Sequence, residues 1–234
     1  MNLSSIRVGG LAGLGFVLVV VTVNLMLGSA GQPRAGASPE EVQAYFAGSP
    51  VAVDVASALA PLAWICLPLF AGGVLAATRA RSAERSDAWP WIGLGAVFMQ
   101  NAVFTGVAAT QVALDAGGLS PEVTWGLWQL HNALFVLNLA GLSIIMLALT
   151  VAGVRTGLVA RPHALVGAAA ATLTATAAVT TSAGMAGGPV ELVGLAGFVL
   201  WLGWLTTYAV VLLRASRPVA VAAVAPVERV TQPA

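Results

Sequence analysis

Residues 121–152 read PEVTWGLWQLHNALFVLNLAGLSIIMLALTVA, and this stretch decides the fold class. It contains no basic side chain and a single acidic one. As an α-helix with a rise of about 1.5 Å per residue it would extend roughly 45 Å, more than the roughly 30 Å hydrocarbon core of a bilayer. Ser120 can cap the start of the helix and Pro121 suits its first turn, while Trp125 and Trp128 are typical of a membrane interface. The stretch therefore predicts a transmembrane helix.

The composition of the whole chain agrees with a membrane protein. Hydrophobic residues make up 59% of the sequence and charged residues 8%, whereas a soluble domain has about 25% charged residues. The net charge of +1 excludes the dense basic surface that a nucleic-acid-binding protein needs, so no nucleic-acid partner is expected. Cys66 is the only cysteine, which excludes an internal disulfide and a thiolate metal cluster.

Six apolar segments are long enough to cross a bilayer. They lie near residues 6–28, 51–78, 90–112, 121–152, 162–186 and 189–213. The sequence thus predicts an all-α protein with one polytopic bundle of six transmembrane helices over residues 1–213. Residues 214–234 are rich in Pro, Ala and Val, which predicts a disordered cytoplasmic tail.

The arginines predict the orientation of these spans. All ten basic residues are Arg, and nine of them fall on one side of the predicted spans, with only Arg34 on the other. The positive-inside rule then places both termini in the cytoplasm. The predicted location is the plasma membrane, which in a bacterium is the inner membrane. The lipid bilayer is the first expected partner, and other membrane subunits or further copies of the chain are the second.

The first apolar segment has an alternative interpretation. Arg7, the apolar run and Gly28-Ser29-Ala30 resemble a secretory signal peptide with a small-residue cleavage site. The run from Val8 to Leu27 is longer than the roughly 7–15 residues usual for such a peptide, which favours a retained span. Cleavage would leave five spans.

The longest predicted outer loop, residues 29–50, contains a helix signal. Ser38-Pro39-Glu40-Glu41 matches a capping box with Pro in the first helical position. Val42, Tyr45 and Phe46 follow at helical spacing and predict one apolar face. We expect a short surface helix over 39–47, serving either as a clamp at the lipid interface or as a lid over an outer cavity.

Polar side chains inside the predicted spans are the best candidates for a site, because such residues usually face the interior of a bundle. We expect a polar cavity open to the outside, with Asp54 and His131 as a proton-sensitive pair; the alternative is plain hydrogen bonding between helices. The candidate cavity residues are Asp54, Gln100, Asn101, Gln111, His131, Asn132 and Asn138.

Other features of the spans bear on packing. Pro61 and Pro68 interrupt the second span, and each removes a backbone hydrogen bond. Gly9 and Gly13 form a GxxxG pair that can pack within the bundle or form a dimer. In the fifth span a stripe of small residues recurs every four positions and is typical of close helix packing: Ala168, Thr172, Thr176, Thr180 and Gly184.

The sequence carries no recognisable cofactor or catalytic motif. The two histidines, His131 and His163, are predicted near opposite ends of their spans, which argues against bis-histidine haem ligation. No zinc, phosphate-loop, nucleophile-elbow or dinucleotide motif is present. We therefore expect no metal, no cofactor and no catalytic residues.

The layout resembles small actinobacterial multi-span membrane proteins of the DUF4386-like kind. The resemblance rests on the entry Arg7-Val8-Gly9-Gly10, on the segment 38–46 with sequence SPEEVQAYF, and on short arginine-bearing inner loops. It covers roughly the first five spans and implies an arrangement of helices, with no activity attached.

Three functional hypotheses follow. The first is a non-enzymatic structural or accessory membrane component, because charged residues are lacking deep inside the spans and no catalytic constellation is present. The second is a small-solute carrier with an outward-opening polar cavity between spans two, three and four. The third is a membrane-embedded enzyme acting on lipid, for which only His131, Asp54 and Glu191 offer ionisable chemistry.

Overall fold

The computed structural model describes residues 3–48, 51–82, 87–185 and 189–216, and every regular element in these ranges is helical. Six helices are long and apolar enough to span a membrane. The protein is thus a multi-span integral membrane protein, and the predicted fold class is confirmed. The long helices are α1 (Leu3–Ser29), α3 (Val51–Arg81), α4 (Trp89–Asp115), α5 (Pro121–Arg155), α6 (Arg161–Val179) and α8 (Pro189–Ala215); the short ones are α2 (Pro39–Ala47) and α7 (Thr181–Met185).

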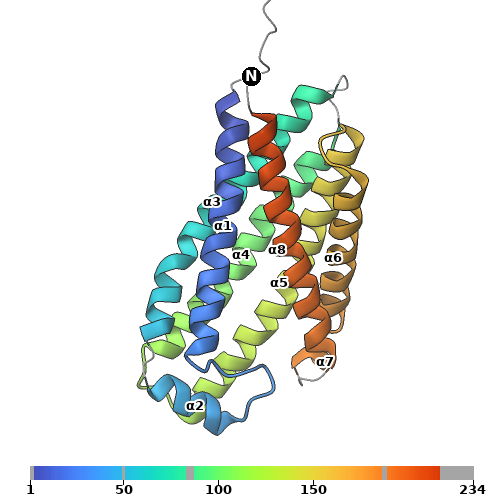
Figure 1. The fold of residues 1–234 in the computed structure, drawn as a ribbon. Helices are drawn as coiled ribbons and strands as arrows, with labels where there is room; N and C mark the ends of the chain where they lie inside the picture. Colours follow the sequence, from blue (N-terminus) through green and yellow to red (C-terminus); the bar gives the residue numbers. More distant parts are fainter. Residues whose placement is uncertain (1–2, 49–50, 83–86, 186–188, 217–234) are drawn as a thin grey trace, which may run out of the picture.

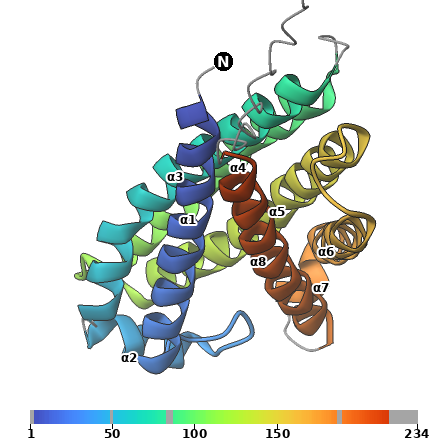
Figure 2. The same ribbon diagram turned by 45° about the horizontal axis from the view of Figure 1, so that its top comes forward.

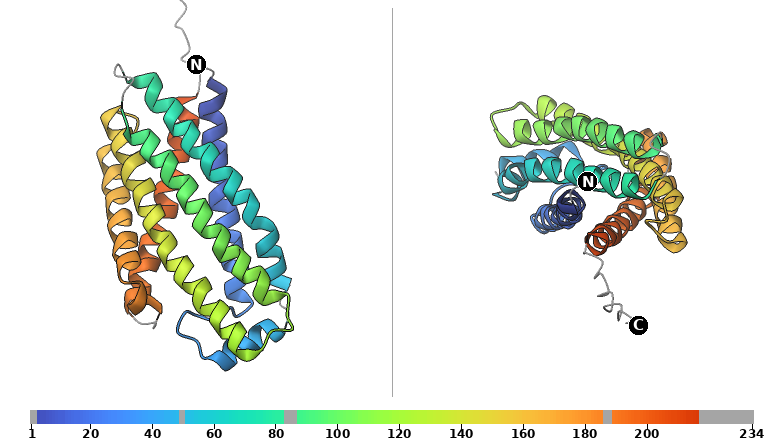
Figure 3. Two further views of the ribbon diagram at one scale, coloured as in Figure 1. Left: turned by 180° about the vertical axis from the view of Figure 1, so that it is seen from behind. Right: turned by 90° about the horizontal axis from the view of Figure 1, so that it is seen from above.

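The six long helices form a closed ring. Consecutive long helices pack against each other along the chain, and α8 returns to pack against α1 (Figure 1; Figure 3, right). Viewed from behind in Figure 3, left, α3, α4 and α5 cross the bundle side by side. Each helix thus hides one face against two neighbours and presents the other face to lipid. Leu18 on α1 and Leu165 on α6, for example, are 68% and 72% exposed.

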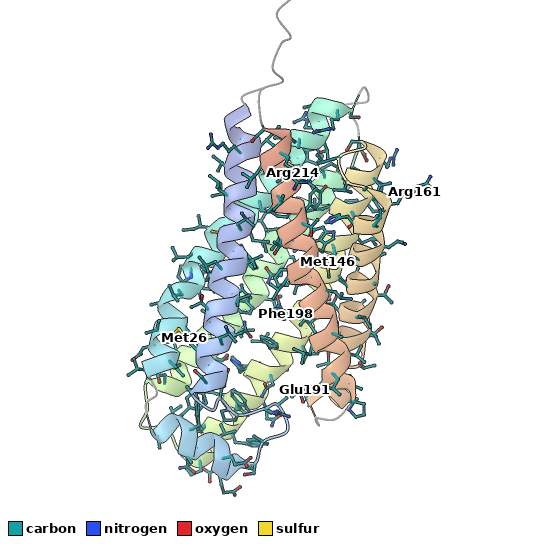
Figure 4. The ribbon with its side chains drawn as sticks, viewed as in Figure 1. Met26, Met146, Arg161, Glu191, Phe198 and Arg214 are labelled. Carbon is teal, nitrogen blue, oxygen red and sulfur yellow. The ribbon has the colours of Figure 1, made fainter. Side chains whose placement is uncertain are left out.

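The two ends of the bundle differ in charge. The start of α1 and the end of α8 lie at the same end, together with Arg161 and Arg214, whereas Glu191 lies at the opposite end (Figure 4). We call these the arginine-rich end and the arginine-poor end; by the positive-inside rule the former is predicted to be cytoplasmic. The predicted disordered tail lies outside the described residues from position 217 onward.

The arginine-rich half is tightly packed around aromatic rings. Phe70 meets Trp204 and Tyr208 edge to face, with centroid distances of 6.2 and 5.7 Å. The Tyr208 hydroxyl donates to the carbonyl of Leu149 at 3.0 Å, and Trp204 Nε1 donates to Thr150 Oγ1 at 3.0 Å. These bonds satisfy the polar tips of the two buried rings, so this half can exclude water without an orphaned donor on either ring.

The GxxxG pair packs within the bundle. Gly9 of α1 faces Gly73 of α3 so closely that a Cβ on Gly9 would lie 2.5 Å from Gly73 Cα, and Gly13 faces Phe70 and Ala209. Of the two predicted roles of the GxxxG pair, packing within the bundle and dimer formation, the structure shows packing within the bundle.

We expect Gly73→Ala to destabilise the protein and Gly72→Ala to spare it. A Cβ on Gly73 would lie 2.6 Å from Gly9 Cα, whereas no atom lies within 4 Å of a Cβ on Gly72. Overpacking of this kind costs about 1–3 kcal/mol, while Ala in place of an unhindered helical Gly gains up to about 1 kcal/mol. Thermal unfolding in detergent measures the difference, and equal midpoints for the two variants would contradict this account of the α1–α3 contact.

The predicted fifth span of 162–186 is wrong in its length. Helix α6 ends at Val179, and α7 follows as a separate helix of five residues. At the break the hydroxyls of Thr180 and Thr181 bond to carbonyls three or four residues earlier, which gives the backbone an alternative to a continuous helix.

The part of the small-residue stripe that lies on α6 faces away from the bundle, whereas its last member, Gly184 of α7, is buried. Ala168, Thr172 and Thr176 are exposed, and the two threonine hydroxyls bond to their own helix. The face that packs inward is also composed of small residues, namely Gly167, Ala170, Ala171, Thr174, Ala177 and Ala178.

Helix α2 forms where the capping box predicts it. Ser38 Oγ accepts from the Glu41 amide at 3.3 Å, and the Glu41 carboxylate accepts from the Ser38 amide at 2.9 Å. The apolar face of α2 packs on protein, because Val42 and Phe46 are buried and the Phe46 ring contacts Trp128 of α5 at 6.0 Å. Helix α2 thus covers the arginine-poor end of the bundle.

Candidate functional site

A cavity of about 410 Å³ lies in the arginine-poor half of the bundle, between α1, α3, α4, α5 and α8. Its volume falls within the range of about 300–1,000 Å³ that is usual for small-molecule sites. Phe16 of α1 and Trp201 of α8 line it and meet edge to face at 5.4 Å. Beyond this ring pair the packed aromatic core of the arginine-rich half begins. The cavity therefore lies only on the arginine-poor side of the Phe16–Trp201 pair, and the packed core separates it from the arginine-rich end.

The structure brings six of the seven predicted site residues to this cavity. They come from α4 and α5, two neighbours in the ring, which form its polar wall. The six are Gln100, Asn101, Gln111, His131, Asn132 and Asn138. His131 and Asn138 share one face of α5, as their spacing of seven predicts, and both side chains are buried.

The seventh predicted residue, Asp54, does not line the cavity. It sits exposed in the first turn of α3, next to Asp115. The expected Asp54–His131 pair is wrong, because the arc of α3 that lines the cavity begins at Ala56 and excludes position 54. The Nδ1 atom of His131 instead lies 3.1 Å from the carbonyl oxygen of Val107 and 3.2 Å from Thr110 Oγ1.

These contacts determine the tautomer of His131. A carbonyl oxygen only accepts hydrogen bonds, so the Nδ1 atom facing Val107 carries the ring proton. When the ring is neutral, Nε2 offers a lone pair, and the ring stacks between Trp128 and Phe135 with centroid distances of 5.2 and 6.5 Å. His131 is thus held as an oriented acceptor in the cavity wall.

The cavity gathers most of the unpartnered polar atoms of the described chain. Ten buried side-chain nitrogen or oxygen atoms have no hydrogen-bond partner within the described residues, and seven of these belong to residues that line the cavity. The seven are Ser57 Oγ, Trp64 Nε1, Gln100 Oε1, Gln111 Nε2, Trp128 Nε1, Asn138 Oδ1 and Trp201 Nε1. Each such atom costs about 1–3 kcal/mol when it stays unsatisfied, and native proteins leave few of them.

Both donors and acceptors occur among these buried atoms. Three indole N–H groups and the Gln111 amide nitrogen are donors, whereas Gln100 Oε1 and Asn138 Oδ1 are acceptors. Ser57 Oγ can do both. The rest of the lining is mostly apolar, with Phe104, Leu139 and Phe198 among its members. An apolar cavity with a few converging polar groups is the usual form of a small-molecule site.

One predicted polar residue has a structural role in addition. Asn101 Nδ2 donates to the carbonyl of Trp64 at 3.1 Å. That carbonyl lies four residues before Pro68, which has no N–H to give it, so Asn101 supplies from α4 the hydrogen bond that the proline removes from α3.

We expect Asn101→Leu to destabilise the protein by about 1–3 kcal/mol, because it leaves the Trp64 carbonyl unpaired. In a Pro68→Ala background residue 68 can donate to that carbonyl itself, and the penalty of Asn101→Leu should shrink. Unfolding midpoints of the two single variants and the double variant give the coupling energy. Equal penalties in both backgrounds would show that the two residues are uncoupled.

Sequence reasoning missed the tryptophans of the site. Trp128 was expected at the membrane interface, but it is 1% exposed and buried between α2 and His131. Trp64 of α3 and Trp201 of α8 also line the cavity. Tryptophan away from the interfaces is itself a signal, because its N–H needs a partner that lipid cannot supply.

Ionisable side chains are scarce at the cavity. Of the described residues that line it, only Arg34, His131 and Glu191 can carry a charge, and Arg34 and Glu191 are exposed at its rim. Within the described ranges no three His, Cys, Asp or Glu side chains come together as metal ligands. Comparisons with protein-family models, curated proteins and solved structures give no match.

Proposed function

We propose that this membrane protein binds an uncharged small molecule in the cavity between α1, α3, α4, α5 and α8. The observation that carries the proposal is that seven of the ten buried, unpartnered polar atoms of the described chain belong to side chains that line one cavity. A purely structural or accessory role leaves these atoms unexplained, since an apolar core would be more stable. None of the described lining residues is a buried Asp, Glu, Lys or Arg, which favours an uncharged ligand.

The one-sided shape of the cavity also supports a carrier as the second candidate function. The cavity is bounded by the Phe16–Trp201 pair, and the arginine-rich half behind it is close-packed. A carrier seen from one side in an alternating-access cycle has this form. Uptake of the bound molecule into sealed vesicles separates a carrier from a protein that only binds.

The binding proposal can be tested by extracting the full-length protein from its own membranes. Mass spectrometry of an organic extract should show one uncharged molecule enriched in near-stoichiometric amount over bulk lipid. Trp128→Phe keeps the ring and removes one cavity donor, so we expect retention to fall roughly tenfold, the equivalent of about 1.4 kcal/mol. Trp125→Phe on the same helix is the control, because Trp125 does not line the cavity.

The proposal fails if the wild-type protein retains no enriched molecule. It also fails if Trp128→Phe and Trp125→Phe retain that molecule equally. Thermal unfolding of both variants checks that a loss of binding is not a loss of fold.

A further inference from the structure

The cavity is bounded by lipid-facing helices on one side. Helices α1 and α8 touch in the arginine-rich half, where Gly10 faces Leu213 and Gly13 faces Ala209. Towards the arginine-poor end the two helices diverge (Figures 1 and 2). There both line the cavity, α1 through residues 19–27 and α8 through residues 190–198. We call this stretch the α1–α8 seam.

Apart from Asn24 of α1 and Glu191 at the rim, the edges of the seam are apolar. Val19, Val20 and Val23 line the cavity from α1, and Leu195 and Phe198 line it from α8. Neighbouring positions on both helices face outward, since Leu18 and Leu192 are 68% and 65% exposed. In a bilayer these surfaces meet acyl chains. A hydrated solute would have to shed its water to pass here, whereas a hydrocarbon chain passes from one apolar medium into another.

Charged and polar side chains line the cavity at its arginine-poor rim. Arg34 and Gln32, in the loop before α2, and Glu191, in the first turn of α8, line this end of the cavity. The polar wall of α4 and α5 stands opposite the seam. The cavity is thus amphipathic, with an apolar side towards lipid and a hydrogen-bonding side towards the bundle centre.

We infer that the ligand is a membrane-borne amphiphile, uncharged and bearing hydroxyl or carbonyl oxygens, which enters sideways from the bilayer through the α1–α8 seam. This rests on the proposed function, and it names the class of ligand and its route. A hydroxyl group matches the wall because it accepts from an indole N–H and donates to an amide oxygen at once. The leaflet it leaves is the one at the arginine-poor end, which is the outer leaflet under the predicted orientation.

The test uses two photoactivatable probes on the full chain in dioleoylphosphatidylcholine vesicles. One is a hexadecanol that carries a diazirine beside its hydroxyl-bearing carbon, and it partitions into the bilayer. The other is a butanediol with the same diazirine, and it stays in water. Peptide mass spectrometry reads which residues are labelled, and we expect the long-chain alcohol to label the cavity faces of α4 and α5 in the wild-type protein.

The route is tested by narrowing the seam. The double variant Val20→Trp, Leu195→Trp places bulk on both edges, and we expect cavity labelling by the long-chain alcohol to fall about tenfold. The control is Leu18→Trp, Leu192→Trp, which adds the same bulk to the lipid-facing side of the same helices and should leave labelling unchanged. Circular dichroism and thermal unfolding establish that both double variants are folded.

The outcomes separate the inference from the function on which it rests. If the long-chain alcohol labels the cavity equally in both double variants, the lateral route is overturned while binding stands. If only the butanediol labels the cavity, the membrane-borne class is overturned in favour of a water-soluble solute, and binding again stands. If neither probe labels the cavity and no molecule co-purifies, the proposed function itself fails.

Discussion

Filling the cavity is expected to abolish ligand binding without loss of the fold. Ala108 on α4 is half-buried and lines the cavity, whereas the next residue, Ala109, is exposed on the outer surface. Ala108→Trp therefore places a large ring in the space that the ligand would occupy, and Ala109→Trp places the same ring in lipid. A ring that competes sterically with a ligand removes most of its binding free energy, so we expect a loss of at least about a hundredfold in affinity, or roughly 2.7 kcal/mol.

The measurement is binding of the molecule extracted from the wild-type protein, followed by its effect on thermal unfolding. A ligand that binds only the folded state raises its stability by RT ln(1 + [L]/Kd). The wild-type protein and Ala109→Trp should therefore gain stability with ligand, and Ala108→Trp should gain none. Equal gains for the two variants would place the binding site somewhere other than this cavity.

Replacing the unpartnered amides is expected to move stability and binding in opposite directions. Gln100 and Asn138 are 5% and 4% exposed, and the amide oxygen of each has no hydrogen-bond partner within the described chain. The double variant Gln100→Leu, Asn138→Leu removes two buried amide oxygens that no described residue satisfies. Ligand-free protein should become more stable by about 1–3 kcal/mol per site, and affinity for the extracted molecule should fall by about a hundredfold.

Asn101→Leu is the matched control, because Asn101 follows Gln100 directly and its amide already has a partner in the Trp64 carbonyl. Its expected effect on stability has the opposite sign. Unfolding midpoints of ligand-free protein decide the matter. If Gln100→Leu, Asn138→Leu is destabilising, these amides have structural partners and the cavity is not built for a ligand. Stabilising a protein at the expense of binding is the usual signature of a functional site.

The number and approximate extent of the spans could be read from the sequence because the bilayer leaves few alternatives. Lipid cannot satisfy backbone N–H and C=O groups, so an apolar run of about twenty residues has to be helical. Helix α2 could also be predicted from the sequence, because its capping box and Pro39 act within a single helical turn. The break between α6 and α7 could not be predicted, because a threonine hydroxyl that bonds to its own backbone does not alter the hydropathy of the segment.

What the sequence determined about the site was depth along each helix and spacing around it. These were enough to place His131 and Asn138 on one face of α5 and to select six residues that line the cavity. The order of the helices around the ring could not be predicted from the sequence, because it depends on the contact of α8 with α1, which joins the two ends of the chain. That closure brings Trp201 against Phe16 and makes one side of the cavity from helices that are nearly 190 positions apart.

Only the tertiary structure decided which polar groups have partners. Gln100 and Asn101 are neighbours in sequence and similar in chemistry, yet one amide is unpartnered in the cavity and the other bonds the carbonyl released by Pro68. Asp54 is a predicted cavity residue like His131, and it still lies outside the cavity, next to Asp115. The physical reason is that hydropathy along the sequence predicts only how deep a side chain lies in the membrane. A hydrogen bond also requires a direction between donor and acceptor, and that direction is set only once the helices are packed.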